Sequence, residues 1–190
     1  MGRGRLDARD GRILLRQDGA GDMSSALGRC GLIVLGVGFG GPVAAQFDAG
    51  IPIGTKAPVI AVNGMDGKPV DLGAWVGKQP VLIEFWATWC SVCQDLLPEL
   101  EAVRTRYGDR VQMIGVNVTV NDSRDRVRRY LGVHKPPFLA LYDDTGVSSR
   151  AFDVPITSYI VVLDAKGTVV YTGSGSDQDL VAAVAKAIPR

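Results

Sequence analysis

The segment from residue 81 to residue 107 constrains the fold of this chain more than any other. An apolar run at 81–85 has the character of a strand. It is followed by two cysteines with C-x-x-C spacing, Cys90 and Cys93, and then by apolar residues at helical spacing. A strand that leads into a helix through such a turn places the first sulfur at the helix N-terminus. The partial positive charge there stabilises a thiolate, so the pattern predicts a reactive pair of cysteines rather than an inert bridge.

Charge and length exclude some classes of partner. The chain has 190 residues and a formal net charge of +1, which suits one domain with an appendage. Its densest basic cluster, at 124–129, contains four arginines and is interrupted by an aspartate, so we interpret it as the solvated face of a helix. No basic stripe interleaved with aromatic residues is present, which argues against nucleic acid as a partner.

The first 45 residues differ in composition from the rest. Residues 1–22 lack apolar periodicity, and we interpret them as an upstream extension from a misassigned start, with Met23 as the initiator. Residues 23–45 have the features of a signal peptide: Arg29, an apolar stretch, and small residues before Gln46. An uncleaved membrane anchor is the alternative, although the apolar run is shorter than the roughly 20 residues that a span requires. We therefore expect export to the periplasm or cell envelope.

Export also bears on the use of cysteine. Cys30 falls inside the predicted signal, so the mature chain would keep only Cys90 and Cys93. A bridge between cysteines this close in sequence adds little stability, because the loop that it closes is short. Redox chemistry is the better explanation of the pair.

The remaining chain has the pattern of one α/β domain. Residues 46–56 are expected to form a linker and 57–190 the domain. Strands are expected at 58–62, 68–71, 81–85, 111–118, 138–142, 159–163 and 168–171. Helices are expected at 93–107 with a kink at Pro98, at 122–131 with Asp122 or Ser123 as the cap and Gly132 as the end, and at 177–188. This order predicts a central mixed β-sheet flanked by helices.

Four motifs resemble the thioredoxin superfamily, and within it the exported TlpA/ResA-like thiol-disulfide oxidoreductases. They are Leu-Ile-Glu-Phe-Trp-Ala-Thr-Trp-Cys-Ser-Val-Cys at 82–93, Leu-Pro-Glu-Leu at 97–100, Val-Pro-Ile-Thr-Ser-Tyr at 154–159 and Leu-Asp-Ala-Lys-Gly at 163–167. The resemblance covers roughly 55–190 and implies a thioredoxin-like fold with an added N-terminal β-hairpin. It also implies protein substrates with cysteines or disulfides, a membrane-bound electron donor, and no cofactor or metal besides the redox-active disulfide. We expect a monomer.

The resemblance also assigns roles to individual residues. Cys90 would be the exposed nucleophile and Cys93 the buried resolving cysteine. Pro155 would be a cis proline facing the pair. Val154 would offer its backbone N–H and C=O to an extended substrate segment, and Trp89 would contact the same substrate.

Glu84 interrupts a strand that should be buried. A buried carboxylate carries a desolvation cost unless it is paired or neutral. In the family, an acidic residue at the matching position assists proton transfer to and from the buried cysteine, which implies this role for Glu84. The alternative is a solvated glutamate at a sheet edge.

The direction of electron flow stays open. The family leans toward reduction of envelope proteins, such as apocytochrome c or proteins with copper-site cysteines. This chain has Ser91-Val92 between its cysteines rather than Gly-Pro, and Leu96 where some members carry a glutamate. Both departures leave the redox potential and the substrate specificity unassigned.

Two other functions compete with this one. A Cu(I) chaperone would use Cys90, Cys93 and a third ligand, for which His134 is the single histidine available. A lone histidine in a loop after a helix is more often solvated than a ligand. A peroxidase of the peroxiredoxin type ranks last, because its Pro-x-x-x-Thr-x-x-Cys pattern is absent before Cys90.

Overall fold

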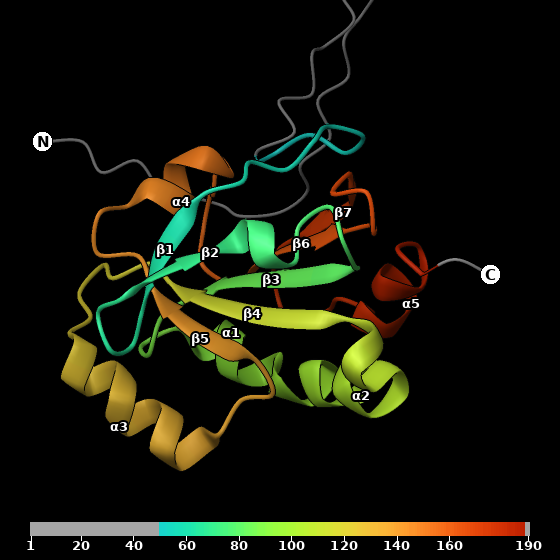
Figure 1. Cartoon of the computed structure of the whole chain (residues 1–190). Coiled ribbons are helices and arrows are strands. Elements are labelled where there is room, and N and C mark those ends of the chain that lie inside the picture. The colour runs from blue at the N-terminus through green and yellow to red at the C-terminus, as the bar shows by residue number, and fades with distance from the viewer. Residues whose placement is uncertain (1–49, 189–190) are drawn as a thin grey trace, which may run out of the picture. The chain divides into compact units, whose positions relative to one another are not determined.

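The computed structural model describes residues 50–188 (Figure 1). The predicted extension and signal peptide, 1–45, and the first part of the expected linker therefore lie outside the described residues. The strands are β1 Ala61–Gly64, β2 Pro69–Asp71, β3 Val81–Trp86, β4 Gln112–Asn117, β5 Leu139–Tyr142, β6 Tyr159–Leu163 and β7 Val169–Gly173. The α-helices are α1 Ser91–Asp95, α2 Leu97–Tyr107, α3 Arg124–His134, α4 Val147–Ala151 and α5 Leu180–Ala185, with short 3₁₀ turns η1 Leu72–Ala74 and η2 Gly108–Arg110.

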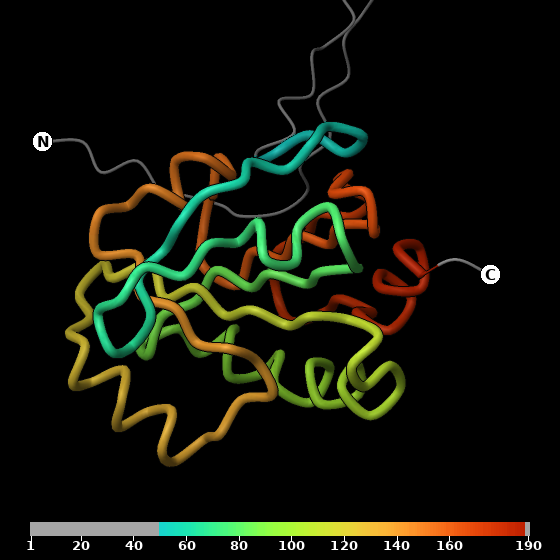
Figure 2. Tube along the Cα trace, in the orientation of Figure 1, coloured from blue at the N-terminus to red at the C-terminus, as the bar shows by residue number. Residues whose placement is uncertain are grey.

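Within residues 50–188 the strands form one seven-stranded mixed sheet in the order β2-β1-β5-β4-β3-β6-β7. The traces of β3, β4 and β5 run side by side in the same direction (Figure 2). In contrast, β6 is antiparallel to β3, and β7 is antiparallel to β6. The β1–β2 hairpin joins the sheet through an antiparallel pairing of β1 with β5. The expected mixed sheet and added N-terminal hairpin are confirmed.

The centre of the sheet is buried on both faces. All six residues of β3 are buried, and alternate side chains point to opposite faces. Phe85 packs against Phe152 on the face that carries η1 and α4. Leu82 packs on the other face with residues of α2 and α5, which Figure 1 shows on the same side as α1 and α3. Each fully buried Leu or Phe contributes about 1.5–3 kcal/mol, so this strand is a rigid base for the turn that follows it.

All three predicted helices differ from the observed ones in their boundaries. The helix expected at 177–188 is shorter, because Asp179 caps α5 and the helix ends at Ala185. The helix expected at 93–107 is broken at Leu96, and Pro98 lies in the first turn of α2, where its missing N–H costs nothing. The prediction that Gly132 ends α3 is wrong. The helix continues to His134, because Lys135 adopts the left-handed conformation that closes it and Pro136 follows.

Two further segments have more structure than the sequence predicts. Helix α4 was not expected, since five residues are too few to show a period. The part of the expected linker that is described, 50–56, is bound to the domain. The Ile51 amide donates to the carbonyl of Phe152 at 3.1 Å, and the Gly54 amide donates to that of Val169 at 2.8 Å. These bonds and the burial of Ile51 explain why 50–56 does not act as a linker.

Candidate active site

Four loops meet at one end of the strands, where β3, β4 and β5 have their carboxyl ends. Because β3, β4 and β5 are parallel, the loops that follow them, at 87–90, 118–123 and 143–146, lie at the same end. Strand β6 is antiparallel to β3, so the segment before it, 152–158, reaches this end too. Sites in α/β sheets form outside the carboxyl ends of parallel strands, and the two cysteines lie there.

A tight turn delivers the first cysteine from β3 to α1. The Cys90 amide donates to the carbonyl of Ala87 at 3.2 Å, and Cys90 caps α1 with an extended backbone. Its Sγ accepts a hydrogen bond from the Cys93 amide at 3.1 Å. Cys90 and Cys93 form a disulfide with their Cα atoms 5.3 Å apart. In the reduced protein this amide would stabilise a thiolate at Cys90, as the sequence predicts.

Both cysteines are largely covered. Cys90 is 5% exposed and Cys93 is 2% exposed, so the expectation of an exposed Cys90 is not met in the disulfide form. The neighbouring side chains reach solvent instead: Trp89 is 49% exposed and Val92 is 37% exposed. The cysteines are buried because they pack in one cluster with Trp86, the last residue of β3.

Glu84 lies beneath this cluster with its side chain buried. It is 1% exposed and shares a sheet face with Trp86, which contacts the cysteine cluster. It is therefore not the solvated glutamate of the alternative interpretation. Among the described residues its Oε1 has no hydrogen-bond partner, and burial raises its pKa from 4.5 to about 8. At neutral pH the carboxyl is therefore mostly protonated and can exchange a proton as conditions change.

Trp89 and Val154 line the same groove. This groove has a volume of about 800 Å³ and also includes Val120, Pro155 and Ile156. The Trp89 indole N–H donates to the carbonyl oxygen of Val120 at 2.6 Å, which holds the ring at one wall. Val120 and Ile156 are each more than half exposed, so the groove has an apolar rim. Neither cysteine lines the groove, and Trp89, the residue before Cys90, joins it to the cysteine turn. The two residues that the sequence assigns to substrate binding are thus brought together.

The predicted cis conformation of Pro155 is wrong. No cis peptide bond occurs among residues 50–188, and Pro155 is exposed in the loop between α4 and β6. The Val154 amide already donates to the carbonyl of Ser149 at 2.9 Å, so it is not offered to a substrate. The reason is local: Asp153 has a positive φ of 48°, which folds Val154 back onto α4. The residue directly before β6 is the buried Ser158.

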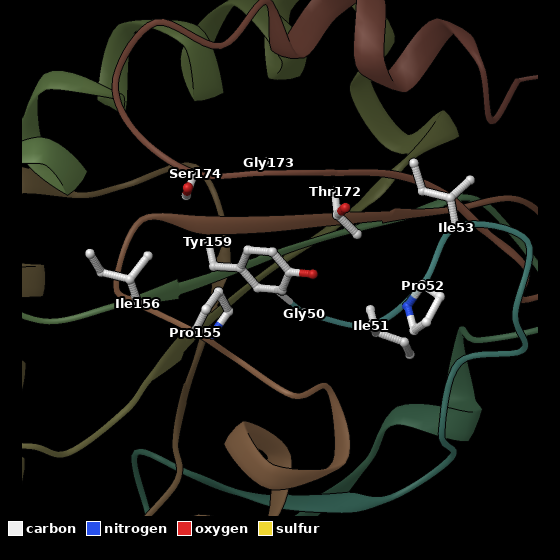
Figure 3. A pocket seen from close by; sticks show the side chains of 10 residues that line it. All are labelled: Gly50, Ile51, Pro52, Ile53, Pro155, Ile156, Tyr159, Thr172, Gly173 and Ser174. Atoms are coloured by element: carbon white, nitrogen blue, oxygen red, sulfur yellow. The ribbon is translucent and has the colours of Figure 1, made fainter. Parts of the chain in front are cut away.

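A second cavity, of about 620 Å³, lies beside the N-terminal segment. Figure 3 shows the Tyr159 ring in its centre, with Ile51 and Pro52 on one side and Pro155 and Ile156 on the other. Trp89 does not line this cavity. Pro155 and Ile156 line both the cavity and the groove that contains Trp89, so they lie between the two.

Sequence reasoning missed the contact that holds the active-site turn. Of the two predicted caps of α3, Ser123 is the observed one, and its hydroxyl accepts from the Arg126 amide at 3.3 Å. Asp122 instead accepts hydrogen bonds from Thr88, two residues before Cys90. An Asn-Asp-Ser run predicts only a turn or a cap, so nothing in the sequence indicated this contact.

The possible metal ligand His134 belongs to a different environment. It is exposed at the end of α3 and stacks on Tyr130 with ring centroids 4.1 Å apart. Within the described part of the chain, no group of three or more histidine, cysteine, aspartate or glutamate side chains is arranged to hold a metal ion. As for the membrane, none of the helices found in residues 50–188 combines the length and hydropathy of a span.

Comparison with known proteins places this site in a family. The model of the Redoxin family matches residues 52–188. The chain belongs to the Redoxin family. It is a thiol-disulfide oxidoreductase of the thioredoxin-like kind, and the resemblance found in the sequence is confirmed.

Three relatives illustrate the breadth of this family. The chain is 28% identical over 158 residues to a thioredoxin-like protein, YneN, of Bacillus subtilis, covering 78% of this chain and 91% of that protein. It is 26% identical over 132 residues to the thiol:disulfide interchange protein DsbE of Yersinia pestis, covering 68% of each. The thioredoxin domain of a thiol-disulfide oxidoreductase from Bacteroides vulgatus has the same fold. Its TM-score is 0.62 at 24% identity, covering 72% of this chain and 97% of that one.

Proposed function

We propose that this Redoxin-family protein reduces disulfides in polypeptides of the cell envelope. The observation that carries the proposal is the Cys90–Cys93 disulfide at the end of β3. It follows the buried Glu84 carboxyl in the chain and directly follows Trp89, which lines the apolar groove. The candidate substrates are cysteine-containing proteins such as apocytochrome c or proteins with copper-site cysteines. The names of relatives, thiol:disulfide interchange proteins among them, support this substrate class.

The reaction passes two electrons to the substrate. The Cys90 thiolate attacks one sulfur of the substrate disulfide, forming a mixed disulfide and releasing the other sulfur as a thiolate. Cys93 then loses its proton and attacks the Cys90 sulfur. The second substrate thiol leaves, and the Cys90–Cys93 disulfide remains. Two thiols of a membrane-bound donor would reduce it again, becoming a disulfide themselves.

Glu84 is the proposed acceptor of the Cys93 proton, which only the ionised form of its carboxyl takes up. A general base works best when its pKa lies near the working pH. The Glu84 pKa of about 8 lies close to that of an ordinary thiol, about 8.5, so the proton moves between the two at little cost. Burial is what places the carboxyl in this range, because desolvation disfavours its charged form.

The groove supplies a surface for the substrate chain. Trp89, Val120 and Ile156 present apolar side chains in this groove, which Trp89 joins to Cys90, and the Val154 carbonyl remains as a candidate acceptor for a substrate amide. An extended segment on either side of the substrate cysteine fits such a surface.

The test follows the mixed disulfide. Reduced protein is mixed with a disulfide-bonded peptide, and the products are separated without reductant. We expect Cys93→Ser to accumulate the mixed disulfide and Cys90→Ser to form none. Turnover by Cys90→Ser would overturn the mechanism.

Direction and location need separate measurements. Equilibration in thiol buffers gives the reduction potential, in which about 30 mV corresponds to 1.4 kcal/mol for this two-electron couple. A strongly negative potential supports reduction, whereas a value near those of oxidants reverses the direction. Fractionation of cells that express the full chain tests export and cleavage before Gln46, and gel filtration tests the expected monomer.

A further inference from the structure

We propose that Asp122 is a positioning residue for Cys90, acting through Thr88. The side chain of Asp122 is fully buried. Its Oδ2 accepts hydrogen bonds from the Thr88 amide at 2.8 Å and from the Asn117 side-chain amide at 2.9 Å. Its Oδ1 accepts the Thr88 hydroxyl, and the nearest cation is the guanidinium of Arg126, 4.0 Å away and half exposed. Each oxygen of the carboxylate therefore accepts a hydrogen bond from Thr88 in the active-site turn.

The backbone groups of Thr88 take no part in the turn's own hydrogen bond. The turn's own hydrogen bond runs from the Cys90 amide to the carbonyl of Ala87, which leaves the amide and carbonyl of Thr88 unused. The Asp122 carboxylate accepts a hydrogen bond from the Thr88 amide, and the side-chain amide of Gln94 donates one to the Thr88 carbonyl at 3.3 Å. With these bonds every polar group of Thr88 has a partner. Thr88 is therefore held from two directions, and it sets where Cys90 begins α1.

The loop that carries Asp122 is held in a costly conformation. Thr119 and Asn121 have positive φ angles of 63° and 54°, which are unfavourable for residues with a Cβ. Hydrogen bonds to neighbouring segments keep the loop there. Among them, the Thr119 hydroxyl donates to the Asp143 carbonyl at 3.2 Å, and the Tyr142 hydroxyl donates to the Asp122 carbonyl at 3.2 Å. Strain of this kind persists only where the surroundings over-determine it.

The strained loop contacts consecutive residues of the turn. Asp122 binds Thr88, and the carbonyl of Val120 binds the indole of Trp89. The loop thus sets the backbone before Cys90 and one wall of the groove at the same time. This gives Asp122 its role: it aligns the Cys90 sulfur with the Cys93 amide that stabilises a thiolate. The role serves the disulfide exchange proposed above and rests on it.

The test measures Cys90 directly. Purified, reduced protein is alkylated with iodoacetamide across a pH series, and the modified Cys90 is quantified by mass spectrometry. The variants are Asp122→Ala, Thr88→Val, which loses the hydroxyl but keeps the amide bond, and Asp164→Ala as the control. Asp164 accepts two backbone amides in the β6–β7 turn, at the opposite end of β3.

We expect Asp122→Ala to raise the apparent pKa of Cys90 and to slow reduction of a peptide disulfide by about tenfold or more, since small misplacements of reacting groups cost up to about 100-fold. Thr88→Val should shift the pKa in the same direction by less. Asp164→Ala should lower the melting temperature and leave the alkylation profile unchanged.

Two outcomes overturn the proposal. A wild-type alkylation profile in Asp122→Ala would make the residue merely structural. A lowered Cys90 pKa would mean that its negative charge, rather than its bonds, acts on the thiolate. If Asp122→Ala does not fold, Thr88→Val decides between the same results. Alkylation does not depend on the substrate, so a failure of the proposed reductase activity is seen separately, in the mixed-disulfide experiment.

Discussion

The indole N–H of Trp89 donates a hydrogen bond to the backbone carbonyl oxygen of Val120, 2.6 Å away. These residues are 31 positions apart and come from the loops that follow β3 and β4. The bond fixes the orientation of a side chain that is half exposed and precedes Cys90 in the sequence. The aromatic ring therefore has a defined position although it is not buried in the core. A fixed side chain loses less entropy when a substrate binds.

Removal of the Trp89 ring should therefore weaken substrate binding more than it slows the chemistry. We expect Trp89→Ala to raise KM for a peptide disulfide several-fold, with a smaller change in kcat, since the ring is groove wall. Trp89→Phe keeps a ring but loses the N–H, so its KM should lie between those of the wild type and Trp89→Ala. Steady-state kinetics with a fluorescent peptide disulfide measures both constants. An unchanged KM in Trp89→Ala would remove Trp89 from the substrate surface.

Glu84 should make the oxidised protein less stable as pH rises. Its folded pKa of about 8 lies above its unfolded value of 4.5, so the folded state binds the proton more tightly. The stability linked to this group is fully present below pH 4.5 and is lost as pH rises to about 8, by about 1.4 kcal/mol per pH unit. Urea unfolding at several pH values should show this slope, and Glu84→Gln should remove it. An equal slope in Glu84→Gln would assign it to other groups.

The same residue should control the resolving step. With Glu84→Gln the Cys93 proton has no nearby acceptor, so the mixed disulfide should decay more slowly, by about 10²–10⁴-fold if Glu84 acts as a general base. Its formation should be unchanged, because Cys90 attacks first. Quenched-flow samples on non-reducing gels separate the two steps. A slowed first step with a normal second step would contradict this role.

Close packing beneath the site can be tested with two glycines. A Cβ on Gly115 of β4 would clash with the Phe138 ring, whereas a Cβ on Gly132 of α3 would meet nothing within 4 Å. Gly115→Ala should therefore cost about 1–3 kcal/mol of unfolding free energy by overpacking. Gly132→Ala should instead add about 0.4–1 kcal/mol, because alanine lowers the entropy of the unfolded chain. Denaturant melts of both variants check the pair, and equal effects would contradict the described packing.

Copper binding offers a check on the alternative function. His134 stacks on Tyr130 at the exposed end of α3 and belongs to no candidate metal cluster in the described residues. We expect His134→Ala to leave the Cu(I) affinity of the reduced protein unchanged, as measured by competition with a chromogenic chelator. A fall in affinity of tenfold or more would restore His134 as a ligand and favour the chaperone.

The parts of the site that lie in one continuous segment could be predicted. Glu84, Cys90 and Cys93 belong to a single strand–turn–helix unit, and local periodicity is enough to bury the first and to place the other two at a helix start. The mixed sheet followed in the same way from the order of its elements.

The parts of the site that depend on contacts between distant segments could not be predicted. Pro155 has the sequence context of the family motif, but its peptide bond and its neighbours depend on how α4 packs and on the turn at Asp153. The end of α3 at His134 rather than Gly132 likewise depends on the left-handed conformation of Lys135. Such positions carry no periodic signal.

Local sequence patterns are enough to place the two cysteines at a helix start and to bury Glu84, because both follow from periodicity within one strand–turn–helix segment, and the order of the strands and helices predicts the mixed sheet. What surrounds the cysteines depends on the folded chain. Asp122 lies 34 residues from Thr88 in the sequence. The two residues are in contact because β3 and β4 are parallel neighbours whose carboxyl ends lie side by side. Hydrogen bonds between loops depend on where the sheet places those loops, and the linear order of residues does not contain that information.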